Sequence, residues 1–180
     1  MKRAVFLDRD GVLNRPIIRG ATAHAPERFE DFEIYPEAKA AVEKLHGAGL
    51  LAIVVTNQPE IARGVCPQND LNAMHRLLKE QMAIDDIYVC PHEDKDRCSC
   101  RKPLPGMLLE AACKWDIDLK RSFMVGDRWR DIGAGNAAGC LTFLIERDYN
   151  GEANPHYRVN DLPEAVSLIL QLLEEEKKAL

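Results

Sequence analysis

The sequence predicts an α/β protein with a doubly wound, Rossmann-like parallel sheet that has helices on both faces. Short runs of apolar and β-branched residues alternate along the 180-residue chain with segments of helical periodicity. The apolar runs are continuous, as a sheet buried on both faces requires. Polar residues follow directly after three of these runs, at the sheet edge where such folds bind their ligands.

Five apolar runs predict the strands of this sheet. The first follows two basic residues, but it is only four residues long and is followed at once by Asp8. It is therefore too short for a signal peptide and is expected to be the first strand. The five runs are 4–7, 50–55, 87–90, 123–125 and 141–145.

Helices are predicted where apolar residues recur every three or four positions. The first of these segments ends at Gly47 or Gly49, because glycine is a frequent helix stop. The segments begin near residues 38, 71, 107, 131 and 162, and the last one is amphipathic with a charged tail. Residues 14–32 lack clear periodicity, and we expect them to form a long loop over the ligand-binding edge.

Composition narrows the class of protein. A hydrophobic fraction of 46% and a charged fraction of 29% are typical of a globular protein, and the length suits one domain, residues 1–180. No stretch is long and apolar enough to span a bilayer, so no membrane partner is expected and the expected location is cytoplasmic. The net charge of −5 argues against a nucleic-acid partner, which would favour a basic face.

Carboxylates follow two of the predicted strands. Asp8 and Asp10 come directly after the first strand and point the same way if the chain there is extended. Asp127 follows the fourth strand, and Asp131 lies four residues further on, on the same side of a helix. A lone D-x-D-G is as often a turn as a site, but four carboxylates at one edge provide the hard oxygen ligands that Mg²⁺ prefers.

Four short motifs occur in a fixed order along the chain: FLDRDGVLN, VVTNQ, CRKP and MVGDRWRD. In this order they resemble the signature motifs of the haloacid dehalogenase superfamily of phosphatases, subfamily IIIA. The resemblance covers roughly the first 145 residues and implies an aspartyl-phosphate mechanism. Because a phosphate ester repels a carboxylate nucleophile, such a mechanism needs a cation such as Mg²⁺.

The resemblance also implies residue roles. Asp8 attacks phosphorus, and Asp10 protonates the leaving oxygen and then activates water. Thr56 and Lys102 hold the phosphoryl group. The implied Mg²⁺ ligands are Asp8, the backbone carbonyl of Asp10 and Asp127, with support from Asp131.

A cysteine–histidine cluster precedes the third motif. Cys90, His92, Cys98 and Cys100 provide a full tetrahedral set for Zn²⁺ within eleven residues, which leaves no position for an activated water. Incidental thiols beside a surface histidine are the less favoured alternative. We therefore expect a structural zinc-bound loop that fixes the position of Lys102. Cys66, Cys113 and Cys140 are isolated, and we expect the last two to pack in the core.

The spacing of the motifs leaves no room for a separate cap domain. Thr56 lies 46 positions from both Asp10 and Lys102, and both intervals are mostly used by predicted elements. The zinc loop, TNQ, IARG and CRKP resemble the subgroup of heptose 1,7-bisphosphate 7-phosphatases and histidinol-phosphatases. The partner implied is a small phosphorylated metabolite, most simply a sugar bisphosphate, and the implied contacts are Asn57, Gln58, Arg63, Arg101 and Arg128.

Two departures from the heptose pattern leave the substrate open. Pro59-Glu60 stands where that motif has Ser-Gly, and the 14–32 segment is longer than its counterpart. The alternatives are a histidinol-phosphatase, a nucleic-acid 3′-phosphatase and a zinc-stabilised binding module without catalysis. The chain is expected to be monomeric.

Overall fold

The computed structural model describes residues 1–179 and contains a six-stranded sheet. The strand order is β5-β4-β1-β6-β7-β8, and each neighbouring pair is parallel. The α/β prediction is therefore confirmed. The strands are β1 (Ala4–Leu7), β4 (Leu51–Asn57), β5 (Asp86–Cys90), β6 (Phe123–Gly126), β7 (Leu141–Ile145) and β8 (Tyr157–Val159).

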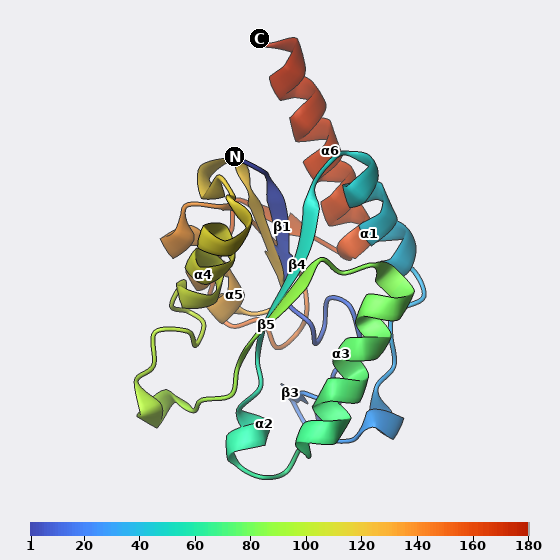
Figure 1. Ribbon diagram of the computed structural model, residues 1–180, viewed down its shortest axis with the longest axis vertical. Coiled ribbons are helices and arrows are strands. Elements are labelled where there is room, and N and C mark those ends of the chain that lie inside the picture. Colours follow the sequence, from blue (N-terminus) through green and yellow to red (C-terminus); the bar gives the residue numbers. More distant parts are fainter. Residues whose placement is uncertain (180) are drawn as a thin grey trace.

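Helices cover both faces of the sheet (Figure 1). One face packs against α1 (Ala38–Gly47), α3 (Gln68–Met82) and α6 (Leu162–Lys178), and their apolar residues share one core cluster with the sheet. The opposite face packs against α4 (Gly106–Trp115) and α5 (Trp129–Ala138), which contribute to a second cluster. The structure is thus a three-layer sandwich with β1 near the middle of the sheet.

The continuous apolar strands divide their side chains between these two cores. Val5 and Leu7 of β1 belong to the cluster of α1, α3 and α6, whereas Ala4 and Phe6 belong to the cluster of α4 and α5. All four side chains are fully buried. Because successive residues of a strand point to opposite faces, a strand with helices on both sides must be apolar at every position.

The segment 14–32 is not the irregular loop that the sequence predicts. It contains an antiparallel hairpin of β2 (Ile17–Arg19) and β3 (Thr22–His24), followed by the short 3-10 helix η1 (Phe29–Asp31). Strand β8 and the short helix α2 (Pro59–Ala62) were also not predicted. These elements are too short to show a periodicity and, unlike β1 and β6, none of them is a continuous apolar run, so the sequence pattern does not reveal them.

The isolated cysteines are distributed differently from expectation. Cys140 is buried, as predicted, but Cys113 is exposed on α4 and Cys66 is buried after α2. The prediction for Cys113 is wrong because it lies on the solvent side of an amphipathic helix whose Met107, Leu108 and Ala111 face the core. Among residues 1–179, no helix has the length and apolar character needed to cross a membrane.

Candidate functional site

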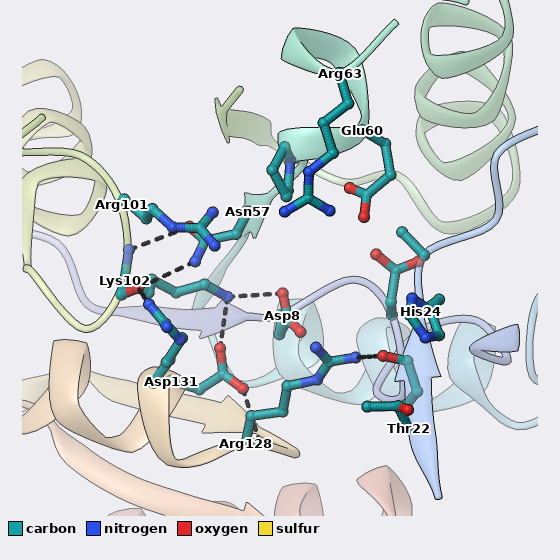
Figure 2. A pocket seen from close by; sticks show the side chains of 15 residues that line it. Asp8, Thr22, His24, Asn57, Glu60, Arg63, Arg101, Lys102, Arg128 and Asp131 are labelled. Carbon is teal, nitrogen blue, oxygen red and sulfur yellow. Dashed lines mark hydrogen bonds and ion pairs between the residues drawn. The ribbon is translucent and has the colours of Figure 1, made fainter. Parts of the chain in front are cut away.

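The candidate site lies at the carboxyl edge of the sheet, where β1, β4 and β6 end side by side. Leu7 of β1 pairs with Val54 of β4 and with Val125 of β6, so the residues that follow share one edge. A cavity of about 300 Å³ opens there (Figure 2). It is lined by Asp8, Asp10, Thr22, Ala23, His24, Ala25, Asn57, Pro59, Glu60, Arg63, Arg101, Lys102, Arg128, Arg130 and Asp131.

Three carboxylates from distant parts of the chain meet at this edge. Asp8, Asp127 and Asp131 are all buried, and one oxygen of each lies within 4.8 Å of the others. Both oxygens of Asp127 are buried without a hydrogen-bond partner among the described residues. Magnesium ligands lie about 2.1 Å from the ion and so up to roughly 4.2 Å apart. The spacing and the unpartnered oxygens therefore fit one shared divalent cation.

Lys102 links two of these carboxylates. Its Nζ donates to Asp8 Oδ1 at 2.7 Å, to Asp131 Oδ1 at 2.5 Å and to the carbonyl oxygen of Val55 at 2.8 Å. The side chain is only 2% exposed. Although burial lowers the pKa of Lys102, the carboxylates of Asp131 and Asp8 raise it more, so its pKa is raised overall. Lys102 is therefore a buried, permanent cation beside the carboxylate cluster.

The pKa values of Asp8 and Asp127 are raised by burial and by the neighbouring carboxylates. Burial raises the pKa of Asp8 to about 6; Asp131 adds to the rise, whereas Lys102 opposes it. Burial, followed by the charges of Asp8 and Asp131, raises the pKa of Asp127 well above its usual value. Like charges in a desolvated cluster repel one another. A divalent cation would remove this repulsion, and the cluster has the composition to hold one.

Asp10 lies outside this cluster, although it lines the same cavity. Its carboxylate accepts hydrogen bonds from Arg9 at 3.0 Å, from Asn14 Nδ2 at 2.9 Å and from Gln58 Nε2 at 2.8 Å. These three donors are themselves fully buried. The Asp10 side chain is thus held in one orientation, separate from the cation-binding carboxylates.

Arg9, which was not predicted as a site residue, is fully buried and contacts the inner side of α3. Its Nη1 lies 3.3 Å from His75 Nε2 and 3.6 Å from Met74 Sδ, and its guanidinium lies over the ring of Phe32. Burial, followed by the charge of Arg9, lowers the pKa of His75 to about 3. The imidazole is therefore neutral at pH 7 and can accept from Arg9.

Two of the predicted phosphate and substrate contacts support other site residues. Gln58 is fully buried and donates to both Asp10 and Thr56 Oγ1, the latter at 2.8 Å. Asn57 makes two hydrogen bonds of 3.1 Å with the backbone of Lys102, one to its carbonyl and one from its N–H. Gln58 and Thr56 are not among the residues that line the cavity, whereas Asn57 is.

All three predicted substrate arginines line the cavity, together with Arg130, which was not predicted. Arg63 pairs with Glu93, and Arg101 and Arg130 both pair with Asp94 at 2.8 Å. Arg128 instead donates to the carbonyl oxygen of Ala23 in the hairpin, at 2.7 Å. Figure 2 shows the guanidinium groups of Arg63, Arg101 and Arg128 around Asp8. The cavity is therefore suited to an anion.

The four zinc-ligand candidates converge as predicted. The Sγ atoms of Cys90, Cys98 and Cys100 lie 3.2 to 3.6 Å apart, and His92 Nδ1 lies 3.3 Å from Cys100 Sγ and 3.6 Å from Cys90 Sγ. Tetrahedral ligands at about 2.3 Å from zinc lie roughly 3.7 Å apart. The spacing and donor types of the cluster fit a zinc ion.

Arg130 and Glu60 were not predicted from the sequence as cavity residues. Arg130 lies on α5, one helical turn before the buried Ala134, and Glu60 lies on a helix of only four residues, so neither carried a signal that the sequence interpretation used. For Arg9 a signal existed. In an extended chain, residues 8 and 10 point to one side and residue 9 to the other, so Arg9 had to point into a covered face of the sheet.

Comparison with known proteins connects this geometry to a family. Residues 15–139 match the family model of haloacid dehalogenase-like hydrolases. A structure of D,D-heptose 1,7-bisphosphate phosphatase from B. bronchiseptica, in complex with magnesium and phosphate, superimposes with a TM-score of 0.82 at 32% identity. The alignment covers 96% of this chain and 99% of that one.

Curated relatives are similar over most of their length. The D-glycero-β-D-manno-heptose-1,7-bisphosphate 7-phosphatase of Rhodopseudomonas palustris is 37% identical over 79% of this chain and 83% of its own. The D-glycero-D-manno-heptose-1,7-bisphosphate 7-phosphatase of Thermosynechococcus vestitus is 35% identical over 92% and 94%. A relative from Photorhabdus laumondii, 36% identical over 80% and 82%, is named for the α anomer.

Gly11 is required by the carboxylate cluster. Its φ is +93°, and a Cβ atom there would lie 1.9 Å from Asp127 Oδ2. We expect Gly11→Ala to lower the free energy of unfolding by more than about 2 kcal/mol, because left-handed strain adds to a buried clash. Urea denaturation measures the loss. Gly49→Ala is the matched control, since Gly49 has φ +77° but a Cβ atom there would have no other atom within 4 Å; equal losses would contradict the close approach.

Proposed function

This chain belongs to the haloacid dehalogenase-like hydrolases and is a phosphoric monoester hydrolase, and we propose that it removes the 7-phosphate of D-glycero-D-manno-heptose 1,7-bisphosphate. The observation that carries the proposal is the buried cluster of Asp8, Asp127, Asp131 and Lys102 at the floor of an arginine-lined cavity. A carboxylate nucleophile, a cation site and an ammonium are the parts that phosphoryl transfer through an aspartyl-phosphate needs.

In the proposed mechanism Asp8 is the nucleophile. Lys102 holds Asp8 Oδ1 and so fixes the carboxylate for attack on phosphorus. Asp8, Asp127 and the backbone carbonyl of Asp10, with support from Asp131, would hold a Mg²⁺ ion, which would supply charge compensation for the phosphoryl oxygens. Thr56, at the end of β4, completes the phosphoryl pocket, and its hydroxyl is oriented by Gln58.

Asp10 is the proposed general acid and base. It donates a proton to the leaving alcohol oxygen as the P–O bond breaks, and it later accepts a proton from the water that hydrolyses the acyl phosphate. The hydrogen bonds from Arg9, Asn14 and Gln58 keep this carboxylate at the cavity wall. Arg9 acts through Asp10 and is therefore a positioning residue.

The second phosphate of the substrate is the proposed ligand of the cavity arginines. Arg128 is the best placed of these, because its side chain is half-buried and donates only to a carbonyl oxygen, whereas Arg63 and Arg101 already pair with acidic side chains. A guanidinium offers the planar donor pair that suits a phosphate. Asn57 contributes by fixing the Lys102 backbone.

We further propose that residues 1–180 act as one monomeric domain in the cytoplasm, without a cap. The segments between the sheet strands hold only a small hairpin, short helices and the cysteine loop in addition to the covering helices. Cys90, His92, Cys98 and Cys100 bind a structural zinc. Free thiolate ligands suit a reducing compartment, and Cys66, Cys113 and Cys140 are also free.

Removing the nucleophile tests the mechanism. We expect Asp8→Asn to hydrolyse p-nitrophenyl phosphate at less than about one-thousandth of the wild-type rate, since no other group replaces the attacking oxygen. EDTA should abolish wild-type turnover, and added Mg²⁺ should restore it. The control is Asp116→Asn, which changes a carboxylate at the C-terminal end of α4, far from the cavity. Unimpaired turnover in metal-free buffer would rule out the Mg²⁺ mechanism.

A substrate panel tests the proposed ester. We expect kcat/KM for heptose 1,7-bisphosphate to exceed the values for the heptose 7-monophosphate, histidinol phosphate and a DNA 3′-phosphate, because only the bisphosphate has a second phosphate for the guanidinium of Arg128, which pairs with no acidic side chain. Steady-state phosphate release measures each value. Arg128→Met should narrow the gap between bisphosphate and monophosphate by about tenfold or more. If kcat/KM were higher for histidinol phosphate or for the DNA 3′-phosphate, the proposed substrate would be wrong and that ester would take its place.

Elemental analysis tests the zinc proposal. Protein purified without added metal should contain about one zinc per chain, and Cys98→Ser should lose it together with part of the thermal stability. The control is Cys113→Ser, which changes an exposed thiol outside the cluster. If the purified protein contained no zinc and Cys98→Ser left the melting temperature unchanged, the proposal of a structural zinc would be wrong.

A further inference from the structure

One acidic residue of the cavity has no part in the proposed mechanism. Glu60 is the second residue of α2 and is only 8% exposed. Its Oε2 is buried and has no hydrogen-bond partner among residues 1–179. Figure 2 shows its carboxylate directed into the cavity beside the Arg63 side chain.

Neither nearby arginine satisfies this carboxylate. Arg63 forms its ion pair with Glu93, on the outer side of the cavity, and Arg9 donates to Asp10. Burial raises the pKa of Glu60, and the charge of Asp10 adds to the rise. A buried carboxylate without a donor costs roughly 1 to 3 kcal/mol or more, so each such group in a native protein requires a reason.

A structural role for Glu60 does not account for its burial. An acidic residue in the first turn stabilises a helix through the helix dipole, but α2 has only four residues, and an exposed carboxylate would do the same. Pro59, directly before it, starts the helix with a preset φ and needs no help from a side chain. Glu60 Oε2 is thus available to accept a hydrogen bond from a group that enters the cavity.

The position of Glu60 relative to Asp10 identifies what enters. Asp10 is the proposed proton donor to the leaving oxygen. It lines the same cavity as Glu60 and accepts a hydrogen bond at 2.8 Å from Gln58, only two residues before Glu60. Glu60 therefore borders the alcohol part of the ester rather than the phosphoryl group on Asp8. A carboxylate in this place repels a second phosphate and favours a hydrogen-bond donor.

We propose that Glu60 is a specificity residue that accepts a hydrogen bond from a donor on the carbon next to the phosphorylated one. The substrate class is then phosphates of primary alcohols with a neighbouring hydroxyl or ammonium group. This inference rests on the proposed phosphatase function and deepens it, since the 7-phosphate of a heptose has such a hydroxyl. It also assigns a purpose to the Pro59-Glu60 sequence, where the heptose motif has Ser-Gly.

Matched pairs of small esters test the inference. Glycerol 3-phosphate and propyl phosphate differ by hydroxyl groups, and 2-aminoethyl phosphate and ethyl phosphate differ by the ammonium. For each pair we would measure the ratio of kcat/KM in the wild type, Glu60→Gln and Glu60→Ala, with Mg²⁺. Where turnover is slow, the same esters are compared as competitive inhibitors of p-nitrophenyl phosphate hydrolysis. Glu80→Gln, which changes an exposed carboxylate on α3, is the control.

The expected result is a loss of discrimination in one pair. A charge-assisted hydrogen bond corresponds to a factor of about 10 to 100, so Glu60→Ala should lower the affected ratio by that factor. If the donor is a hydroxyl, the glycerol ratio falls, and Glu60→Gln loses less because its amide oxygen still accepts. If the donor is an ammonium, the aminoethyl ratio falls equally in both variants.

Two results would overturn the inference. Ratios that stay at the wild-type value in both variants would show that Glu60 does not contact the alcohol. A uniform fall of kcat/KM for all four esters, with constant ratios, would show that Glu60 only supports the fold of α2. Failure of the phosphatase function itself is separate: the wild type would then hydrolyse no ester, p-nitrophenyl phosphate included.

Discussion

The structure depends on a balance of buried charge at the end of β1. Asp8, Asp127 and Asp131 lie together out of contact with bulk water, and the buried ammonium among them belongs to Lys102. Three carboxylates and one ammonium leave two negative charges, which a divalent cation matches. Burying unpaired charge is expensive, so the loss of any one member would leave the others without compensation in a buried place. Other residues at the carboxyl edge of the sheet hold these four side chains in place.

The supporting contacts follow from where Lys102 lies. It follows the cysteine loop and precedes α4, in a segment without regular secondary structure. The side chain of Asn57 pairs with its backbone N–H and carbonyl, and the cysteine cluster anchors the same segment to Cys90 at the end of β5. Gly126 lets the Asp131 side chain approach β6, since a Cβ atom there would lie 2.1 Å from Asp131 Cβ. These contacts thus hold the Lys102 segment, which has no regular secondary structure, in a fixed position relative to the sheet.

Sequence predicted the parts whose patterns are long or chemically distinctive. Continuous apolar runs revealed five strands of the sheet, and the polar residues after them indicated the carboxylates. The CRKP motif indicated Lys102, and the spacing of cysteine and histidine indicated the cysteine cluster. Strands β2, β3 and β8, of three residues each, have no periodicity to detect, so the hairpin that supplies Thr22 and His24 to the cavity was missed. Glu60 was missed for another reason: a charged residue is expected at the surface, and only tertiary packing shows that this one is buried. For Arg9 the alternation of side chains along the strand gave a signal that the sequence interpretation did not use.

The cavity has a phosphoryl half, around Asp8, and an alcohol half, around Glu60, and the two differ in how many substitutions they can tolerate. The phosphoryl half is constrained by mutual charge compensation, so a change at Asp8, Asp127 or Lys102 leaves the others unpaired in a buried place. The alcohol half is built from the hairpin and from α2, which contribute few residues to either core cluster. Substitution there alters what the cavity accepts without disturbing the buried charges. Glu60 lies on this side, and a carboxylate there is tolerated because its cost is local. Under the proposed function, the chemistry is therefore fixed by electrostatics at the sheet edge, whereas the choice of ester belongs to short elements outside both core clusters.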